Sequence, residues 1–213
     1  MVFEDEWKKK PELIKAMIKF RLKKFDGIRL HARKLEARRL QHNKEWEPFF
    51  NQYHLDGSAK ARFGYGLFHD GEMVECMTVR TNHRGECEIA RLATDYHYSV
   101  MGGASKLIAA IKKEIGDKPL VSFSNNRLSS GGIYKTLGFE NITQTTAPSY
   151  YYTDGNVRIW RYRCKRINEP EIIKDFPTET AQAHGGIFAE RILGEKKPLW
   201  RIEDCGHIKW VLK

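Results

Sequence analysis

Cysteine is scarce in this sequence and is never paired at short range. The 213 residues contain four cysteines, with no C-x-x-C motif: Cys76, Cys87, Cys164 and Cys205. A zinc site built on cysteines needs closely spaced pairs, and a disulfide framework needs a denser set. The sequence therefore indicates reduced thiols in a cytosol and no metal site.

Long apolar runs are also absent. No stretch approaches the roughly 18 residues that a membrane-spanning helix needs. The opening MVFEDEWKKK lacks the apolar segment of a secretion signal. We therefore expect a protein that is neither exported nor bound to a membrane. The apolar share of 41% and the five tryptophans are typical of a globular chain with a sizeable core.

Acidic residues are the minority, 27 against 37 Lys and Arg, and the formal net charge is +10. Residues 8–44 hold fourteen basic residues and three acidic ones, and VRIWRYRCKR at 157–166 holds five basic residues and no acidic one. Two basic segments favour a polyanionic partner, most often nucleic acid. A basic surface without such a partner is the alternative. The candidate DNA contacts are Arg29, Arg33, Lys34, Arg158, Arg161 and Arg163.

Apolar spacing and turn residues predict where helices and strands lie. Pro11 followed by apolar residues at helical spacing predicts a basic helix, and Asn43 is the expected cap of a second helix. Alternation predicts one strand over residues 28–40 and further strands over 87–94 and 119–124. Hairpins are predicted at Asp70-Gly71, at Asp154-Gly155 and in LWRIEDCGHIKWVL, residues 199–212.

This order of elements predicts a mixed α/β fold with a largely antiparallel sheet flanked by helices. Hairpins precede the strand–loop–helix–strand unit, which excludes a doubly wound nucleotide fold. We expect a basic helix over residues 1–27, a catalytic core over 28–166 and a C-terminal extension over 167–213. The extension, with its closing hairpin, is expected to belong to the same domain as the core.

The stretch HYSVMGGASKLIAAI, residues 97–111, places glycines and small residues at the start of a helix. Free backbone N–H groups and the positive end of the helix dipole bind anions at such a position. The stretch lacks the G-K-[ST] of a P-loop and the spacing of a dinucleotide fingerprint. The expected anion site comprises Gly102, Gly103, Ala104, Ser105 and Lys106, and an ordinary helix entry is the alternative.

The strand EIARLAT, the glycine loop and its helix, and IYKTLGF at 133–139 resemble the GNAT superfamily of acyl-CoA-dependent acyltransferases. The resemblance implies the GNAT fold and a bound acetyl-CoA or related acyl-CoA, held by the loop together with Leu92 and Thr94. It also implies that Tyr134 protonates the departing thiolate. Gly102 and Ala104 match the family's loop pattern, whereas Ser99 stands where a basic residue is usual.

A narrower resemblance extends from about residue 28 to residue 212. HARKLE, FFNQYHLDG, VMGGASKLI, VSFSNNRLSSGGIYKTLGF, PSYYYTDGNVRIWRYR and RIEDCGHIKW are similar to segments of the phage Mom-like DNA-modification proteins. This implies modification of adenine at N6, which protects phage DNA from restriction in the host cytoplasm. The residues carried over are His54, Arg91, Ser122, Asn125 and Tyr150. Asn125 departs from the family, which commonly has Asp there, and an amide cannot act as a base.

His54 is the candidate general base, because a histidine titrates near neutral pH. As alternatives, His54 is a loop cap, Ser122 a small core residue, and Tyr134 and Tyr150 packing rings. Two other functions stay open: an acyltransferase acting on a protein or small amine, and a non-catalytic protein that binds DNA or a host factor. The oligomeric state does not follow from the sequence.

Overall fold

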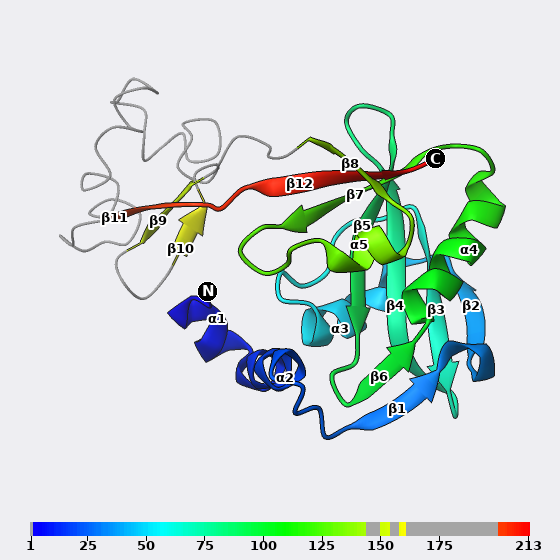
Figure 1. Ribbon diagram of the computed structural model, residues 1–213, viewed down its shortest axis with the longest axis horizontal. Helices are drawn as coiled ribbons and strands as arrows, with labels where there is room; N and C mark the ends of the chain where they lie inside the picture. The colour runs from blue at the N-terminus through cyan, green and yellow to red at the C-terminus, as the bar shows by residue number, and fades with distance from the viewer. Residues whose placement is uncertain (1, 144–149, 154–157, 161–199) are drawn as a thin grey trace.

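A seven-stranded sheet runs through the computed structural model, which describes residues 2–143, 150–153, 158–160 and 200–213 (Figure 1). In spatial order its strands are β2 (Glu36–Leu40), β3 (Phe63–His69), β4 (Glu72–Thr81), β5 (Cys87–Thr94), β7 (Leu120–Asn125), β12 (His207–Leu212) and β8 (Glu140–Thr143). Neighbours are antiparallel except β5 and β7, which are parallel. The expected mixed, largely antiparallel fold is confirmed.

Two smaller sheets and five α-helices complete the described part of the chain. β1 (Ile28–His31) pairs parallel with β6 (Tyr98–Met101), and β9 (Tyr150–Thr153) lies between β10 (Arg158–Trp160) and β11 (Trp200–Glu203). The helices are α1 (Glu4–Lys9), α2 (Pro11–Arg21), α3 (Asn43–Tyr53), α4 (Gly103–Ile115) and α5 (Gly132–Thr136), with a 3₁₀ turn η1 (Ala32–Lys34).

The core forms where α4 and α3 cover the large sheet. Leu107 and Ile111 lie one turn apart on α4 and are buried in one cluster with Leu67 of β3. On α3, Trp46 and Phe50 are also one turn apart and are fully buried in a second cluster. Burial of each such side chain contributes about 1.5–3 kcal/mol to the free energy of folding. Both clusters also include residues of β4 and β5, so the two helices pack on these strands.

β5 and β7 pair only briefly and then separate. Their ladder consists of Cys87 with Leu120 and Glu88 with Val121. Both strands continue beyond it, because β5 stays paired with β4 as far as Thr94 and β7 stays paired with β12 as far as Asn125. The β4–β5 register also skips Ala90, and such a bulge bends a strand. The sheet therefore opens in its middle toward the carboxyl ends of β5 and β7.

Several predicted elements are confirmed. α2 begins at Pro11, β5 spans residues 87–94, and the β3–β4 hairpin turns at Asp70 (φ 49°) and Gly71 (φ 88°). Two positive φ angles in succession are what a two-residue hairpin loop with the right twist requires. β9 and β10 are antiparallel as predicted, while their turn at Asp154-Gly155 lies outside the described residues.

Three predictions about elements are wrong. Residues 28–40 form β1, η1 and β2 rather than one strand, because Ala32 and Leu35 are both buried at helical spacing. The N-cap of α3 is His42, whose backbone N–H donates to Glu45 (2.7 Å). The third hairpin does not form: β11 pairs with β9, whereas β12 is inserted between β7 and β8.

Candidate functional site

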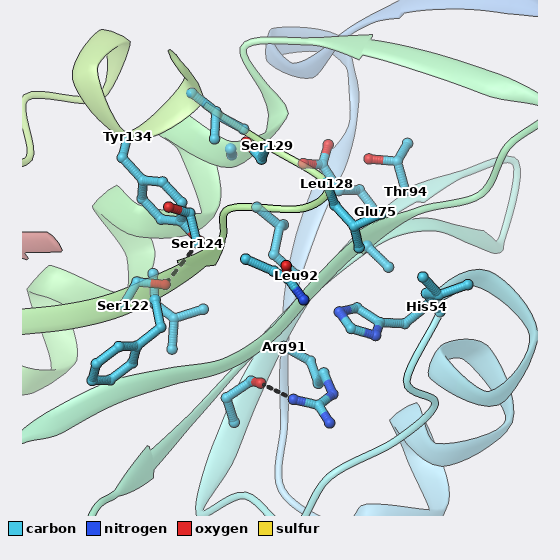
Figure 2. Close-up of a pocket in the computed structure, with 18 of the residues that line it drawn as sticks. His54, Glu75, Arg91, Leu92, Thr94, Ser122, Ser124, Leu128, Ser129 and Tyr134 are labelled. Carbon is cyan, nitrogen blue, oxygen red and sulfur yellow. Dashed lines mark hydrogen bonds between the residues drawn. The ribbon is translucent and has the colours of Figure 1, made fainter. Parts of the chain in front are cut away.

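The separation of β5 and β7 creates an open pocket of about 1600 Å³ (Figure 2). Its walls include residues 89–94 of β5, 122–125 of β7 and 102–105 at the start of α4, and α2, α5 and the segment after α3 complete them. Small-molecule pockets are commonly about 300–1,000 Å³. This pocket is therefore large enough for a long ligand together with part of a second molecule.

Among the described residues, no strand lies between the two strand edges that face the gap. Beyond Glu88 and Val121 the inner edges of β5 and β7 do not pair with each other. Backbone N–H and C=O groups at such edges are obligatory hydrogen-bonding groups. An extended ligand with amide groups would form hydrogen bonds with these edges, as an added β-strand does.

The start of α4 lies at one end of the gap and has no side-chain cap. Gly102 is the N-cap in the left-handed conformation (φ 76°), and no side chain caps the helix. The first helical bond is donated by the backbone N–H of Lys106 to Gly102 (3.0 Å). The N–H groups of residues 103–105 therefore have no partner within the helix and suit an anion. Leu92, Thr94, Gly102, Gly103, Ala104 and Ser105 all line the pocket, and their binding of a cofactor stays a prediction.

Lys106 does not belong to this group, so its assignment as a cofactor contact is wrong. Its ammonium donates to the backbone carbonyls of Ala32 (3.0 Å) and Leu35 (2.6 Å). The side chain thus closes the carboxyl end of η1. It supports the turn that leads into β2.

His54 and Arg91 line the pocket from α3 and β5. His54 is the C-cap of α3, and its Nδ1 accepts a hydrogen bond from the backbone N–H of Asp56 (3.1 Å). The guanidinium of Arg91 donates to the carbonyls of Gly57 (2.9 Å) and Ala90 (2.9 Å), which fixes its position. Arg91 is thus held by the bulge in β5 and by the turn after α3.

The environment of His54 keeps its imidazole neutral. Burial, with help from the charges of Arg91 and Lys10, lowers the pKa of His54 to about 4. In a neutral imidazole whose Nδ1 accepts a hydrogen bond, the proton resides on Nε2. His54 is therefore a hydrogen-bond donor at neutral pH. This corrects the prediction that it titrates near 6.5 as a general base.

Ser122 and Tyr134 form a bonded pair on the opposite wall. The hydroxyl of Ser122 donates to the phenolic oxygen of Tyr134 (2.9 Å), and the tyrosine ring stacks on Trp210 (centroids 5.5 Å, interplanar angle 14°). Burial raises the pKa of Tyr134, so its phenol stays protonated. Since the phenolic oxygen accepts from Ser122, its own hydrogen is available to another acceptor.

Asn125 and Tyr150 lie in different places. Asn125 lines the pocket at the end of β7, where its side-chain oxygen accepts from the backbone N–H of Arg127 (2.9 Å) and forms a turn. Tyr150 is buried in β9, opposite Glu203 of β11, and is not part of the pocket lining. The catalytic role expected for Tyr150 stays a prediction, and its strand β9 belongs to a separate sheet.

Glu75 is a pocket residue that the sequence analysis missed. It lies on β4, its side chain is buried, and Oε2 has no hydrogen-bond partner among the described residues. Its backbone faces Thr94 across the β4–β5 ladder. The signal in the sequence is a lone acidic residue inside the apolar run MVECMTV.

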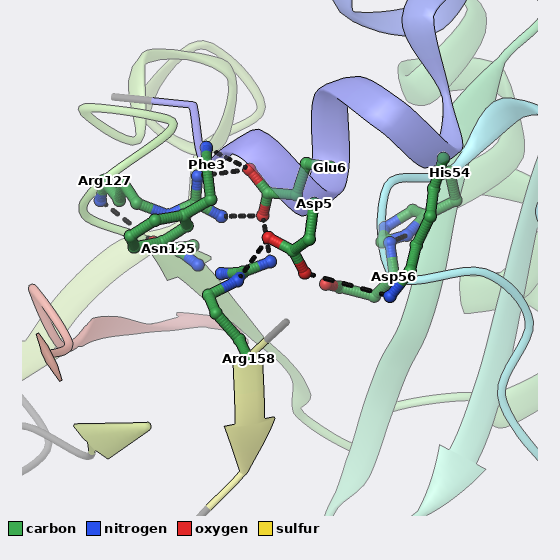
Figure 3. Close-up of polar contacts among 9 residues, drawn as sticks. Phe3, Asp5, Glu6, His54, Asp56, Asn125, Arg127 and Arg158 are labelled. Carbon is green, nitrogen blue, oxygen red and sulfur yellow. Dashed lines mark hydrogen bonds and ion pairs between the residues drawn. The ribbon is translucent and has the colours of Figure 1, made fainter. Parts of the chain in front are cut away.

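The residues predicted to contact DNA lie in different surroundings. Arg29, Arg33 and Lys34 are exposed on β1 and η1. Arg158 is nearly buried and pairs with Asp5 (2.8 Å) and Glu6 (2.9 Å) of α1 (Figure 3). Arg158 is thus wrong as a phosphate contact. Arg161 and Arg163 lie outside the described residues.

Metal and membrane features are absent from the described parts of the chain. No group of three His, Cys, Asp or Glu side chains is arranged to hold a metal ion in residues 2–143, 150–153, 158–160 and 200–213. Over the same ranges, no helix has the length and apolar character needed to cross a bilayer.

Known proteins resemble this chain only in part. No family model matches the sequence, and no curated protein matches it. Among solved structures, an acyl-CoA N-acyltransferase from Pseudomonas aeruginosa is 13% identical, with a TM-score of 0.42 over 54% of this chain and 94% of that one. The ribosomal-protein-S18-alanine N-acetyltransferase from Escherichia coli is 16% identical, with a TM-score of 0.41 over 51% and 80%.

An N-acetylglutamate synthase from Neisseria gonorrhoeae, complexed with coenzyme A and N-acetyl-glutamate, is 18% identical. Its TM-score is 0.35 over 70% of this chain and 24% of that one. Because these TM-scores lie below 0.5, what the three proteins bind and do is not transferred to this chain. Its activity has to be inferred from its own pocket.

Proposed function

We propose that this protein is an acyl-CoA-dependent acyltransferase. The observation that carries the proposal is the gap between β5 and β7, which ends at the bare N-terminus of α4. An acyl-CoA combines an extended arm containing amides with a pyrophosphate. The unpaired strand edges suit the arm, and the N–H groups of residues 103–105 suit the pyrophosphate.

The residues at the start of α4 fit such a cofactor. Larger side chains at this point would exclude it. Gly102 and Gly103 have no side chains of their own at the start of α4, and no side-chain cap bonds to the helix there. The cofactor, when bound, supplies an acyl group activated as a thioester. The remaining chemistry falls to side chains around the gap.

His54 and Arg91 supply hydrogen-bond donors for the acyl oxygen. Both line the pocket, Arg91 is cationic, and His54 presents an N–H group at Nε2 while its pKa is about 4. Donors fixed in advance stabilise negative charge as it develops on an acyl oxygen, typically by about 3–4 kcal/mol each. His54 is held by Asp56, and Arg91 by Gly57 and Ala90, so neither needs to reorganise.

Tyr134 holds the proton that a departing thiolate needs. Its phenol is kept protonated by burial and is oriented by Ser122 and by the stacked ring of Trp210. A positioned general acid accelerates such a step by about 10²–10⁴-fold. Asn125 forms a turn and contributes no base.

We further propose that the acceptor is a DNA base, with adenine N6 the first candidate, as in phage enzymes that protect DNA from restriction. The resemblance to Mom-like proteins and the exposed Arg29, Arg33 and Lys34 support this. The pocket is also wide enough to admit a flipped base beside a cofactor. The neutral exocyclic amine attacks the thioester carbonyl, the C–S bond breaks, and the departing thiolate takes the phenolic proton of Tyr134. The proton that the attacking nitrogen loses passes through solvent and restores the phenol of Tyr134.

The test combines thiol release with mass spectrometry. Purified full-length protein is incubated with acetyl-CoA and DNA, free CoA is followed with a thiol reagent, and the DNA is digested to nucleosides. The proposal predicts DNA-dependent release of CoA and a nucleoside heavier by the acyl group. Release of CoA with a peptide or polyamine but not with DNA would reassign the acceptor. No CoA release with any of these acceptors would contradict the acyltransferase proposal.

A further inference from the structure

Glu75 has a buried carboxyl group with no partner in the part of the chain that the structure describes. Its exposed fraction is 4%, and Oε2 is inaccessible to solvent and makes no hydrogen bond. Other buried acids are paired: Glu6 with Arg127, and Glu88 with Arg80. A buried polar group without a hydrogen bond costs about 1–3 kcal/mol. A ligand that bonds to Glu75 would recover that free energy.

The carboxyl group is aimed at the N-terminus of α4. A Cβ atom built on Gly103 would lie 1.7 Å from Oε2, 2.6 Å from Cδ and 2.9 Å from Oε1 of Glu75. The whole group therefore packs against the first residue of the helix. Glu75 is also one of the residues that line the pocket (Figure 2). A helix start with unbonded N–H groups and an unpartnered acid converge on the same space.

Burial keeps this acid neutral at physiological pH. It raises the pKa of Glu75 to about 8, with no contribution from a charged neighbour. Titratable groups on the surrounding elements are otherwise engaged or neutral: Cys76 is buried on β4, Lys106 on α4 bonds to Ala32 and Leu35, and Asp95 after β5 bonds to His97. Tyr98 of β6 also lines the pocket. A protonated carboxyl group has one O–H donor to offer.

We propose that protonated Glu75 donates a hydrogen bond to an anionic oxygen of the ligand at the N-terminus of α4. Glu75 is then a specificity-determining residue, which admits the ligand when protonated and repels it when ionised. This inference rests on the proposed function, in which the anion is the pyrophosphate of acyl-CoA.

The proposal predicts that ligand binding is linked to a proton. An anion that binds protonated Glu75 more tightly raises its pKa further, so the complex takes up a proton above about pH 8. Affinity then falls by up to about tenfold per pH unit above that value. Below it, affinity is independent of Glu75 ionisation.

The experiment is calorimetric titration of the full chain with acetyl-CoA between about pH 7 and pH 9, in buffers of different ionisation enthalpy. The acetyl group blocks the thiol of coenzyme A, so ionisation of the thiol does not contribute to the proton count. Wild type is expected to lose about tenfold in affinity over this range and to take up close to one proton at the upper end. Glu75→Gln keeps a neutral donor, so its affinity should be independent of pH and its proton uptake absent.

Glu75→Leu removes the donor and should weaken binding at every pH. Glu114→Gln, the same substitution near the far end of α4 and outside the pocket lining, is the control and should behave as wild type. The wild-type pH dependence and proton count need no variant, so a variant that fails to fold does not prevent the test.

Failure of the role of Glu75 and failure of the proposed function give different results in this titration. Tight acetyl-CoA binding that is independent of pH and without proton uptake in the wild type would overturn the role of Glu75 and leave the proposed function standing. No acetyl-CoA binding by wild type or by Glu114→Gln at any pH would overturn both.

Discussion

His54 illustrates how a residue's chemistry depends on its immediate surroundings. As an isolated histidine it would titrate near 6.5 and serve as a base. Burial and the neighbouring cations Arg91 and Lys10 instead lower its pKa to about 4, and Asp56 occupies Nδ1. The same side chain thus becomes a fixed donor. Its role changes from accepting a proton to stabilising negative charge.

This role predicts the behaviour of His54→Ala. Loss of one donor to the acyl oxygen should lower kcat by about 10²–10³-fold, with little change in acetyl-CoA affinity. In the wild type, protonation of His54 should affect the rate only as the pH falls toward about 4. The measurement is kcat against pH, with His69→Ala, outside the pocket lining, as the control. A wild-type acid limb near pH 6.5 would restore His54 as the base.

Tyr134→Phe tests the proton donor. Removing the hydroxyl should lower kcat by about 10²–10⁴-fold and leave the affinity for acetyl-CoA nearly unchanged. Ser122 loses its acceptor, so the free energy of unfolding should fall by about 1–3 kcal/mol. Tyr65→Phe, whose hydroxyl bonds to Glu114 away from the pocket, is the matched control. Equal kcat in Tyr134→Phe and wild type would leave Tyr134 a packing residue.

The sequence could predict that a residue lies at the pocket only where the course of the backbone alone determines its position. Gly102 is at the start of α4 because its left-handed conformation (φ 76°) favours glycine, and Arg91 lines the pocket because β5 passes along it. Lys106 and Arg158 were assigned wrongly because distant partners fix their side chains: two carbonyls at η1 for one, and the acids of α1 for the other. Such long-range pairs leave no local pattern.

At the scale of elements, the start of α4 is the most sensitive point. Gly103→Ala would place a Cβ 1.7 Å from Oε2 of Glu75, so the end of that side chain would have to move toward the pocket that it lines. We expect a loss of about 1–3 kcal/mol in the free energy of unfolding and at least tenfold weaker acetyl-CoA binding.

Gly132→Ala is the control for this prediction. No atom lies within 4 Å of a Cβ built on Gly132, at the start of α5. This variant should be neutral, or more stable by about 0.4–1 kcal/mol. Thermal denaturation and acetyl-CoA titration check both variants. Unchanged affinity in folded Gly103→Ala would remove the anion from this helix end.

Elements with local partners were predictable, and those with distant partners were not. The β3–β4 hairpin follows from Asp70-Gly71, because a two-residue turn brings adjacent strands together. β12 was expected to pair with the strand before it. Instead β12, with its buried Trp210 and Val211, lies between β7 and the edge strand β8. That position depends on which strands have an open edge, and a single segment of sequence does not contain that information.

Over the whole molecule, the net charge of +10 is the feature that bears on a polyanionic acceptor. Replacing Arg29, Arg33 and Lys34 with alanine should reduce the salt dependence of DNA binding by about 0.9 per lost phosphate contact. Affinity measured by fluorescence anisotropy over a range of salt concentrations gives the slope. Acetyl-CoA affinity, measured in parallel, should not change. An unchanged slope would place DNA elsewhere on the protein, and no DNA binding at low salt would favour a protein or small amine as acceptor.

The domain boundaries at residues 27 and 166 stay a prediction, but the site already combines distant parts of the chain. α2, β5, β7 and α5 all contribute to one pocket. A ligand that binds there must therefore change the hydrogen exchange of several separate segments at once.

Hydrogen exchange followed by mass spectrometry, with and without acetyl-CoA, tests the central claim most directly. If the cofactor lies between β5 and β7 with its pyrophosphate on α4, backbone amides in residues 89–94 and 103–105 should exchange more slowly in its presence. Peptides from β2 and the β3–β4 turn, which lie outside the pocket lining, should be unaffected. Protection confined to other segments, or no protection anywhere at saturating acetyl-CoA, would contradict the account.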